Sequence, residues 1–462
     1  MSTQAAKLTA VPQSKSPSLQ ADFSWMFVGN AVYAAGQFLI LMVLAKLVRP
    51  ELVGQYALGL AIVYPVMMFT NMQLRSVITS GSREQVHFGH FLVLRLLSTA
   101  AGLATVFVVT RAMHYGRELT LVILMVGFAY SIETISDVYY ARLQLHDRMA
   151  EIAKSLMARA ILSVIGIGVV TYVTRSVFWG LAGVLFARVL VLVSYDISER
   201  TQGLGSRSAW FSPNEALRPK FNLKTQAELA WLSIPLGIVV LLGCLNASVP
   251  NFFIKQALGE RDLGIFAAIG FVVSVGNMAV VSLGQSAFTR LARSYKAADF
   301  AEFRSLLCKL LLFGAFIGVS GMIVSKFAGR AILTVLFRPE YAERADLLPW
   351  IMVAGGVLYM AQFVGFGLTA ANCYKPQVWL NVAANVALVA ACYAFVARQG
   401  LLGAILAMLI GASVQLAGSI VVLMVGVRKR TGQLDHTSLD RRTELLNISR
   451  PSETRAAFRI AD

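Results

Sequence analysis

Charged residues are scarce in this sequence. They make up 14% of its 462 residues, and hydrophobic residues make up 57%, whereas about 25% of a soluble domain is charged. A water-soluble core does not account for so apolar a chain. Cysteine is also rare, and the four cysteines have no paired spacing; they are Cys244, Cys308, Cys373 and Cys392. We interpret them as small packing residues rather than as disulfide partners or metal ligands.

The motifs of common enzyme classes are missing as well. The sequence contains no nucleotide-binding loop, no pair of catalytic acids in an aqueous loop and no serine–histidine arrangement. His87 and His90 are spaced for one helix face but lack a third metal ligand. We therefore predict a protein that is not an enzyme and has no cofactor or metal site. The net charge of +17 lies in loops and a tail, which argues against nucleic acid as a partner.

Long apolar stretches make up most of the chain. Residues 53–74 and 264–289, for example, contain no charged residue. About 20 apolar residues in a helix cross a hydrocarbon core about 30 Å thick, and a backbone in lipid must satisfy its own hydrogen bonds. We predict an all-α polytopic membrane protein with twelve transmembrane helices. The predicted spans are residues 24–47, 54–78, 88–110, 119–138, 152–173, 177–197, 229–252, 264–287, 304–326, 347–370, 377–397 and 400–427.

Polar segments divide the chain into five predicted parts. These are an N-terminal cytoplasmic tail (1–23), a six-helix bundle (24–197), a cytoplasmic linker (198–228), a second six-helix bundle (229–427) and a basic cytoplasmic tail (428–462). The last tail has no apolar period, so we expect it to be disordered. Residues 290–304 mix basic side chains with Leu291, Tyr295, Phe300 and Phe303, which predicts an amphipathic helix lying on the membrane.

Lysine and arginine are distributed unevenly between the two sides of the predicted membrane. If the N-terminus is cytoplasmic, the inner segments hold about twice as many as the outer loops. This bias predicts that both termini face the cytoplasm. The first apolar stretch is too long for the core of a signal peptide and further spans follow it, so we expect it to remain as an anchor.

A short internal repeat is visible within the sequence. Leu-Val-Gly-Gln-Tyr-Ala at 52–57 leads into the second span, and Asp-Leu-Gly-Ile-Phe-Ala at 262–267 leads into the eighth. We interpret Gly54 and Gly264 as turn glycines that precede these helices. Within the two helices, Pro65 and Gly276 fall at nearly matching depths, where each can bend the backbone. Six helices repeated without inversion predict two bundles related by an axis along the membrane normal, with a central cavity that would bind cargo.

Several ionisable residues lie within the predicted spans, where a charge at the bilayer centre costs about 2.5–3.5 kcal/mol. Two roles explain Arg75 and Arg95 equally well: they anchor the helices at the inner headgroups, or they bind substrate. Glu133 and Asp137 lie four residues apart on one helix face. These acids have two possible roles: to neutralise Arg95 or Arg159, or to couple transport to an ion. Arg188 lies too deep to reach the headgroups, so we expect it to face a cavity or a partner. The candidate cationic cavity comprises Arg188, Arg159, Arg95, Arg75 and Lys309, and the ion-coupling candidates are Glu133 and Asp137. Four arginines against two acids predict a positive interior suited to phosphate oxygens.

The segments 23–25, 36–38, 44–46 and 53–57 of this sequence together resemble the start of Wzx-type polysaccharide flippases. These belong to the exporters of multidrug, oligosaccharidyl-lipid and polysaccharide substrates, and the resemblance covers roughly residues 20–428. It implies translocation of oligosaccharide repeat units, linked by pyrophosphate to a polyprenyl lipid, from the inner to the outer leaflet of the bacterial inner membrane. The assembled product would be O-antigen, capsule or exopolysaccharide. The implied partners are this lipid-linked substrate, the bilayer, and a polysaccharide polymerase with other assembly proteins.

Three other functions compete with this one. An ion-coupled multidrug antiporter of the same superfamily would be expected to have a negative or neutral cavity, which the arginines do not favour. A flippase for the peptidoglycan precursor usually has fourteen spans, and no extra pair follows Val427. A membrane polysaccharide polymerase or ligase would need a sizeable outer loop, whereas the largest one here, about 328–346, is short.

Overall fold

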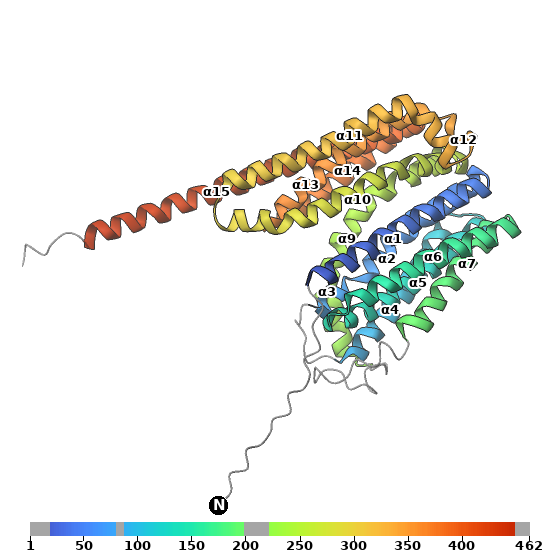
Figure 1. The fold of residues 1–462 in the computed structure, drawn as a ribbon, viewed down its shortest axis with the longest axis horizontal. Coiled ribbons are helices and arrows are strands. Elements are labelled where there is room, and N and C mark those ends of the chain that lie inside the picture. Colours follow the sequence, from blue (N-terminus) through green and yellow to red (C-terminus); the bar gives the residue numbers. More distant parts are fainter. Residues whose placement is uncertain (1–18, 80–86, 198–220, 449–462) are drawn as a thin grey trace, which may run out of the picture. The chain divides into compact units, whose positions relative to one another are not determined.

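The structure is a computed structural model that describes residues 19–79, 87–197 and 221–448 (Figure 1). Its regular secondary structure within these ranges is helical, and twelve helices are long and apolar enough to cross a membrane. The predicted all-α class and the number of spans are therefore confirmed. Large apolar side chains such as Trp231 and Phe327 are exposed along the helices, as expected of surfaces that face lipid rather than water.

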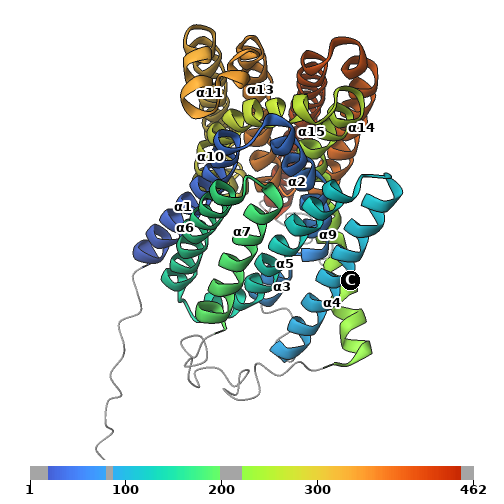
Figure 2. The same cartoon turned by 90° about the vertical axis from the view of Figure 1, so that its right-hand side faces the viewer.

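The chain forms two compact units, of which the first comprises residues 1–268 together with 336–340. Figure 2 shows α1, α6 and α7 of this unit beside one another. Its elements are α1 (Leu19–Leu47), α2 (Pro50–Asn71), α3 (Leu74–Thr79), α4 (Phe88–Ala112), α5 (Arg117–Leu145), α6 (Met149–Thr174), α7 (Val177–Val191), the π-helix η1 (Leu192–Asp196), α9 (Leu223–Leu258) and the start of α10 (Glu260–Lys296).

Small residues bring α1, α6 and α7 into backbone contact. A Cβ added to Gly29 or Gly36 of α1 would lie 2.7 Å from the Cβ of Ala153 or Ala160 of α6. A Cβ on Gly166 of α6 would likewise lie 2.7 Å from the carbonyl oxygen of Gly183 on α7. Close approach through small residues is the main packing device between helices in lipid. It fixes the three helices that carry Tyr33, Arg159 and Arg188.

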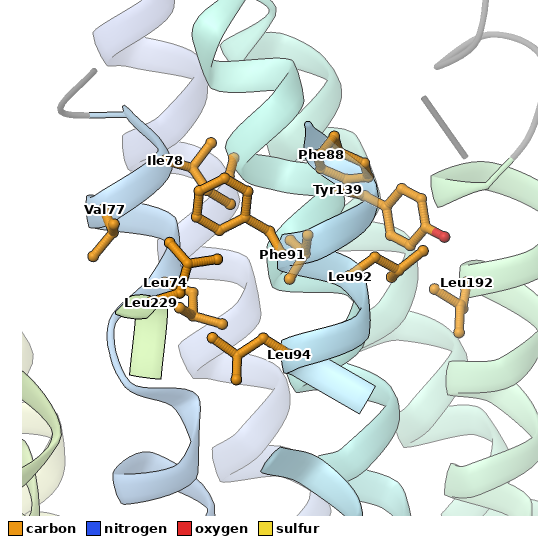
Figure 3. Packing of buried hydrophobic residues seen from close by; sticks show 12 residues of the cluster. Leu74, Val77, Ile78, Phe88, Phe91, Leu92, Leu94, Tyr139, Leu192 and Leu229 are labelled. Carbon is orange, nitrogen blue, oxygen red and sulfur yellow. The ribbon is translucent and has the colours of Figure 1, made fainter. Parts of the chain in front are cut away.

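The second predicted span is broken near one end. α2 ends at Asn71, and Met72 and Gln73 both have a φ of 51° before α3 begins at Leu74. The single helix expected over 54–78 is therefore wrong at this point. Leu74, Val77 and Ile78 anchor α3 in a buried apolar cluster with Phe88, Phe91, Leu92 and Leu94 of α4 (Figure 3).

The second compact unit comprises residues 269–335 and those from 341 onward. Gly318 of α11 packs against Gly356 of α13, where an added Cβ would lie 2.6 Å from the facing Cα. Tyr359 donates a 2.6 Å hydrogen bond to the carbonyl oxygen of Val273. The elements of the second unit are the rest of α10, α11 (Phe300–Leu336), the short α12 (Pro339–Ala342) and η2 (Ala345–Leu347) near the unit boundary, α13 (Leu348–Ala370), α14 (Tyr374–Gln399) and α15 (Leu401–Ile448).

The amphipathic surface helix predicted over 290–304 is not present. α10 continues to Lys296, a turn follows, and α11 begins at Phe300. The aromatic side chains that suggested membrane contact pack on one another: the ring of Tyr295 lies 5.9 Å from that of Phe300 and 5.6 Å from that of Phe303. An aromatic cluster thus closes the turn between two long helices.

Some helices also begin or end at residues other than those predicted. α15 extends to Ile448, so the disorder expected from residue 428 is wrong as far as that residue. α1 begins at Leu19 and α9 at Leu223, inside the predicted tail and linker. Residues 1–18, 198–220 and 449–462 of the predicted tails and linker lie outside the described residues. The division into two six-helix bundles with a cavity between them stays a prediction.

The repeated glycines lie inside helices rather than in turns, which corrects their predicted role. Within the first unit, a Cβ on Gly54 of α2 would meet the carbonyl oxygen of Glu260 on α10, and a Cβ on Gly264 would meet that of Pro50. The two corresponding stretches of the repeat therefore cross reciprocally, and only glycine permits the approach. Gln55 donates a 2.9 Å hydrogen bond to Glu260 beside this crossing.

Candidate functional site

Six of the seven charged candidates lie in the first compact unit. α3, α4, α6 and α7 position Arg75, Arg95, Arg159 and Arg188, and α5 positions both Glu133 and Asp137. Lys309 lies on α11 of the second unit, where its side chain is exposed. The structure thus brings the predicted arginines and acids of the first unit together around α5.

Arg188 belongs to a first buried cluster. Its Nη1 donates to the carbonyl oxygen of Ala129 at 2.9 Å and to Oε2 of Glu133 at 3.0 Å. Tyr33 of α1 donates to the other oxygen of Glu133 at 2.5 Å, and the guanidinium lies 5.2 Å from the ring centroid of Tyr130. The side chain of Arg188 is 3% exposed and that of Glu133 is 23% exposed. Arg188 therefore has a carboxylate partner, and the acid is the more accessible member of the pair.

Arg159 belongs to a second and fully buried cluster. Its Nη2 donates to Oδ2 of Asp196 at 2.8 Å and to Ser136 at 2.7 Å. The other oxygen of Asp196 accepts from Ser155 at 2.6 Å, and Ser155 is 2.7 Å from the hydroxyl of Tyr140. Hydrogen bonds to both carboxylate oxygens compensate for removing the pair from water. The π-helical turn η1 is a local insertion of the kind found at functional sites, and it places Asp196 beside Arg159.

Arg95 closes the end of α2. Its Nη1 donates to the carbonyl oxygen of Asn71 at 2.9 Å, and its Nη2 donates to Oδ1 of Asn71 at 3.1 Å. The same Nη2 lies 3.4 Å from Oδ2 of Asp137. A helix end leaves carbonyl groups without intrahelical partners, and here a buried guanidinium satisfies one of them. The predicted pairing of one acid with Arg95 is therefore present, at Asp137.

Arg75 is the most accessible of the four arginines. Its side chain is 26% exposed, and its Nη1 lies 3.6 Å from Oδ1 of Asp137. Its Nε donates to Oε1 of Gln144 at 2.8 Å, and its guanidinium lies 5.9 Å from the ring centroid of Tyr140. Asp137 thus lies between two arginines, at longer distances than those of the pairs made by Arg159 and Arg188.

Sequence reasoning missed several members of these clusters. Asp196 lies at the end of the predicted span 177–197 but was not counted among the candidate acids, so the predicted balance of four arginines against two acids becomes four against three. Arg142, near the end of α5, is a further buried arginine. Tyr33 gave no signal in the sequence, because a tyrosine on an apolar helix looks like a packing residue. Asp196 did give one, since it is an acid directly at the end of an apolar run.

The buried guanidinium groups retain donors without a partner among the described residues. These are Nε of Arg95, Nε and Nη1 of Arg159, and Nε of Arg188. Leaving a buried donor unsatisfied costs about 1–3 kcal/mol, and more for a charged group. Such donors favour a polar or anionic ligand that can reach them. The first unit therefore combines positive charge, spare donors and two partly exposed acids, Glu133 and Asp137, in helices long enough to span a membrane.

Two solved structures establish the fold of the chain. The lipid II flippase MurJ in an inward closed conformation matches with a TM-score of 0.69 at 11% identity, covering 90% of this chain and 92% of that one. An inward-facing multidrug resistance MATE family transporter of the MOP superfamily matches with a TM-score of 0.62 at 15% identity, covering 93% and 98%. The chain has the fold of MOP superfamily transporters.

A sequence relative adds to the likeness in fold. The chain is 28% identical over 402 residues to the capsular polysaccharide biosynthesis protein CapF of Staphylococcus aureus, which covers 86% of this chain and 96% of CapF. It is a distant homologue of that protein, in agreement with the resemblance to Wzx-type flippases. No protein-family model matches the chain.

Proposed function

We propose that this protein is a flippase for oligosaccharide repeat units linked through pyrophosphate to a polyprenyl lipid. It moves them from the inner to the outer leaflet of the bacterial inner membrane for polysaccharide assembly. The observation that supports this most is the set of ion-paired arginines within the spans of the first unit, among them Arg188. A positively charged interior matches a cargo whose head group is a pyrophosphate, and the distant homology to CapF favours the same pathway.

The carboxylates are the natural competitors of such a cargo. Arg188 is held by Glu133, whose other oxygen is held by Tyr33. A phosphate group can form two parallel hydrogen bonds to one guanidinium, as a carboxylate does. We propose that the pyrophosphate replaces Glu133 at Arg188. The buried Arg159 and Arg95 would add to the positive electrostatic potential at this position without contacting the pyrophosphate. The barrier to desolvating the anion falls because the guanidinium groups are already in place.

The same competition offers a route to coupling. Binding of a proton or a sodium ion at Glu133 would neutralise its charge and release Arg188 for the cargo. Export of the cargo would then allow the pair to re-form. The protein would act as a transporter without chemical catalysis, driven by an ion gradient, the membrane potential or consumption of the product.

The orientation of the chain is part of this proposal. The excess of lysine and arginine on one side supports an orientation with both termini in the cytoplasm. We expect reporter fusions after residues 212 and 435 to be cytoplasmic and one near residue 341 to be periplasmic. A cytoplasmic reporter at all three positions would contradict the assignment of the spans in the second half.

A multidrug antiporter is the second candidate, because a multidrug resistance MATE transporter has the same fold. It would select cations, which the arginines of the first unit disfavour. In proteoliposomes, we expect the purified protein to translocate a polyprenyl-pyrophosphate oligosaccharide, detected by a membrane-impermeant glycosidase, and not to move a cationic dye. Dye transport without lipid translocation would favour the antiporter. Imposed proton and sodium gradients in the same vesicles identify the coupling ion.

A further inference from the structure

The helix of the second predicted span is interrupted between α2 and α3. Met72 and Gln73 both adopt the left-handed conformation, with φ of 51°, which is rare for side chains larger than glycine and persists where the surroundings impose it. Irregular backbone at membrane depth is tolerated where it is buried in protein or lines a water-filled cavity. In transporters, broken helices of this kind supply groups to the substrate site.

The break is held in place from both sides. On one side, Arg95 donates to both the backbone and the side-chain oxygen of Asn71, the last residue of α2. On the other, Leu74 and Val77 of α3 are buried in the apolar cluster (Figure 3). Arg95 is fully buried, and two of its donors are engaged in this role. Its charge nevertheless contributes to the potential at the break.

The side chain that the break presents is Arg75, the second residue of α3. It is 26% exposed, and its 3.6 Å contact with Asp137 is the longest among the four arginine–carboxylate pairs of the site. Asp137 also faces Arg95 at 3.4 Å, so it would keep one cationic neighbour if Arg75 turned to another anion. Gln144 accepts from Nε of Arg75 and orients the guanidinium. Arg75 can therefore exchange its counter-ion at a lower cost than Arg159 or Arg188.

We propose that Arg75 and Asp137, at the break between α2 and α3, form a capture site for the pyrophosphate head of the lipid-linked substrate. The site lies at the end of the second span that the charge bias predicts to be cytoplasmic. The pyrophosphate displaces Asp137 from Arg75 and forms a two-pronged contact with the guanidinium. Asp137 then remains with Arg95. This site rests on the proposed function, precedes the exchange at Arg188, and selects a pyrophosphate over the single phosphate of ordinary acidic lipids because of its greater charge.

The test is binding to the purified full-length protein in phosphatidylcholine nanodiscs. The probe is polyprenyl pyrophosphate without sugar, measured by native mass spectrometry, with phosphatidylglycerol as competitor. Arg75→Gln should weaken binding by about tenfold or more, as expected for loss of charge-assisted hydrogen bonds, and Arg75→Lys should weaken it less. Asp137→Asn should tighten binding, because the competing carboxylate is gone. Arg148→Gln is the matched control: Arg148 is 30% exposed, is paired with Glu151 and should leave binding unchanged.

Two results would overturn the site. One is unchanged probe affinity in folded Arg75→Gln and Asp137→Asn variants, and the other is equal binding of phosphatidylglycerol and the probe. If Arg75→Gln does not fold, Arg75→Lys and Asp137→Asn decide. Translocation by wild-type vesicles separates the two proposals. If the wild-type protein transports the substrate but Arg75 variants bind the probe normally, only the capture site is contradicted. If binding depends on Arg75 but no transport is seen, only the flippase function is contradicted.

Discussion

The two compact units solve the problem of polar groups in a membrane differently. Among the described residues, the buried charged side chains all lie in the first unit: Arg95, Arg142, Arg159, Arg188 and Asp196. In the second unit the buried polar side chains are uncharged, as with Ser325, Asn385 and Ser419. There Gln415 donates to Asn381 at 3.3 Å and joins α15 to α14.

This difference distinguishes polar groups that only join helices from charged groups that call for a functional explanation. An amide or hydroxyl bond between helices in lipid contributes about 0.6 kcal/mol on average, and it needs no ligand to explain it. A buried guanidinium costs several kcal/mol unless it is paired, and its pairing adds little net stability. The first unit therefore contains an arrangement that stability alone does not favour. The proposed binding of an anionic cargo would supply a reason for it.

The largest effect on folding is expected at the fully buried pair of the first unit. Asp196→Asn leaves Arg159 without its counter-ion and should destabilise the protein by about 3–5 kcal/mol. The double variant Arg159→Met with Asp196→Leu removes both charges and should recover most of the folded yield. Thermal unfolding in detergent, monitored by size exclusion, measures both. A single variant as stable as wild type would show that this pair does not organise the unit.

Glu133 is expected to have a smaller effect on folding and a large one on coupling. Its partner Arg188 retains a hydrogen bond to the carbonyl oxygen of Ala129, so Glu133→Gln should still fold. We expect this variant to lose the dependence of translocation on an ion gradient, because its charge no longer changes. Asp137→Asn should keep that dependence. Measured in vesicles with imposed gradients, unchanged ion dependence in both variants would remove the coupling role from these acids.

The smallest effect is expected in the second unit. Gln415→Leu removes the interhelical bond to Asn381 and should change stability by less than about 1 kcal/mol. Translocation at equal protein level should remain near wild type. A loss of transport comparable to that of a first-unit arginine variant would contradict the contrast between the units.

The sequence predicted the fold well because the bilayer imposes a simple rule. A stretch of apolar residues long enough to cross lipid must be helical, so twelve spans could be counted without any tertiary information. Local interruptions followed no such rule. The break at Met72 and Gln73 has neither proline nor glycine to mark it, and it depends on Arg95 from another helix.

The site was predictable in its residue types but not in its pairings. A charge inside an apolar run is visible in the sequence, which identified Arg188, Glu133 and Asp137. Which acid meets which arginine depends on helix rotation, as in the pairing of Arg188 on α7 with Glu133 on α5. Asp196, at the end of the predicted sixth span, was not counted among the candidate acids because nothing in the sequence marks the π-helical turn that places it beside Arg159. Neither property is encoded in a local pattern.

The most direct test of the account is the rate of translocation of lipid-linked oligosaccharide by Arg188 variants at equal incorporation into vesicles. Arg188→Lys keeps the charge without the planar fork and should retain partial transport. Arg188→Ala should lose most of it, and Arg188→Glu should be worse, because it sets a carboxylate against the phosphates and beside Glu133. Wild-type rates in a folded Arg188→Ala variant would contradict the role of this arginine, and near-normal rates in Arg188→Glu would contradict an anionic cargo at this site.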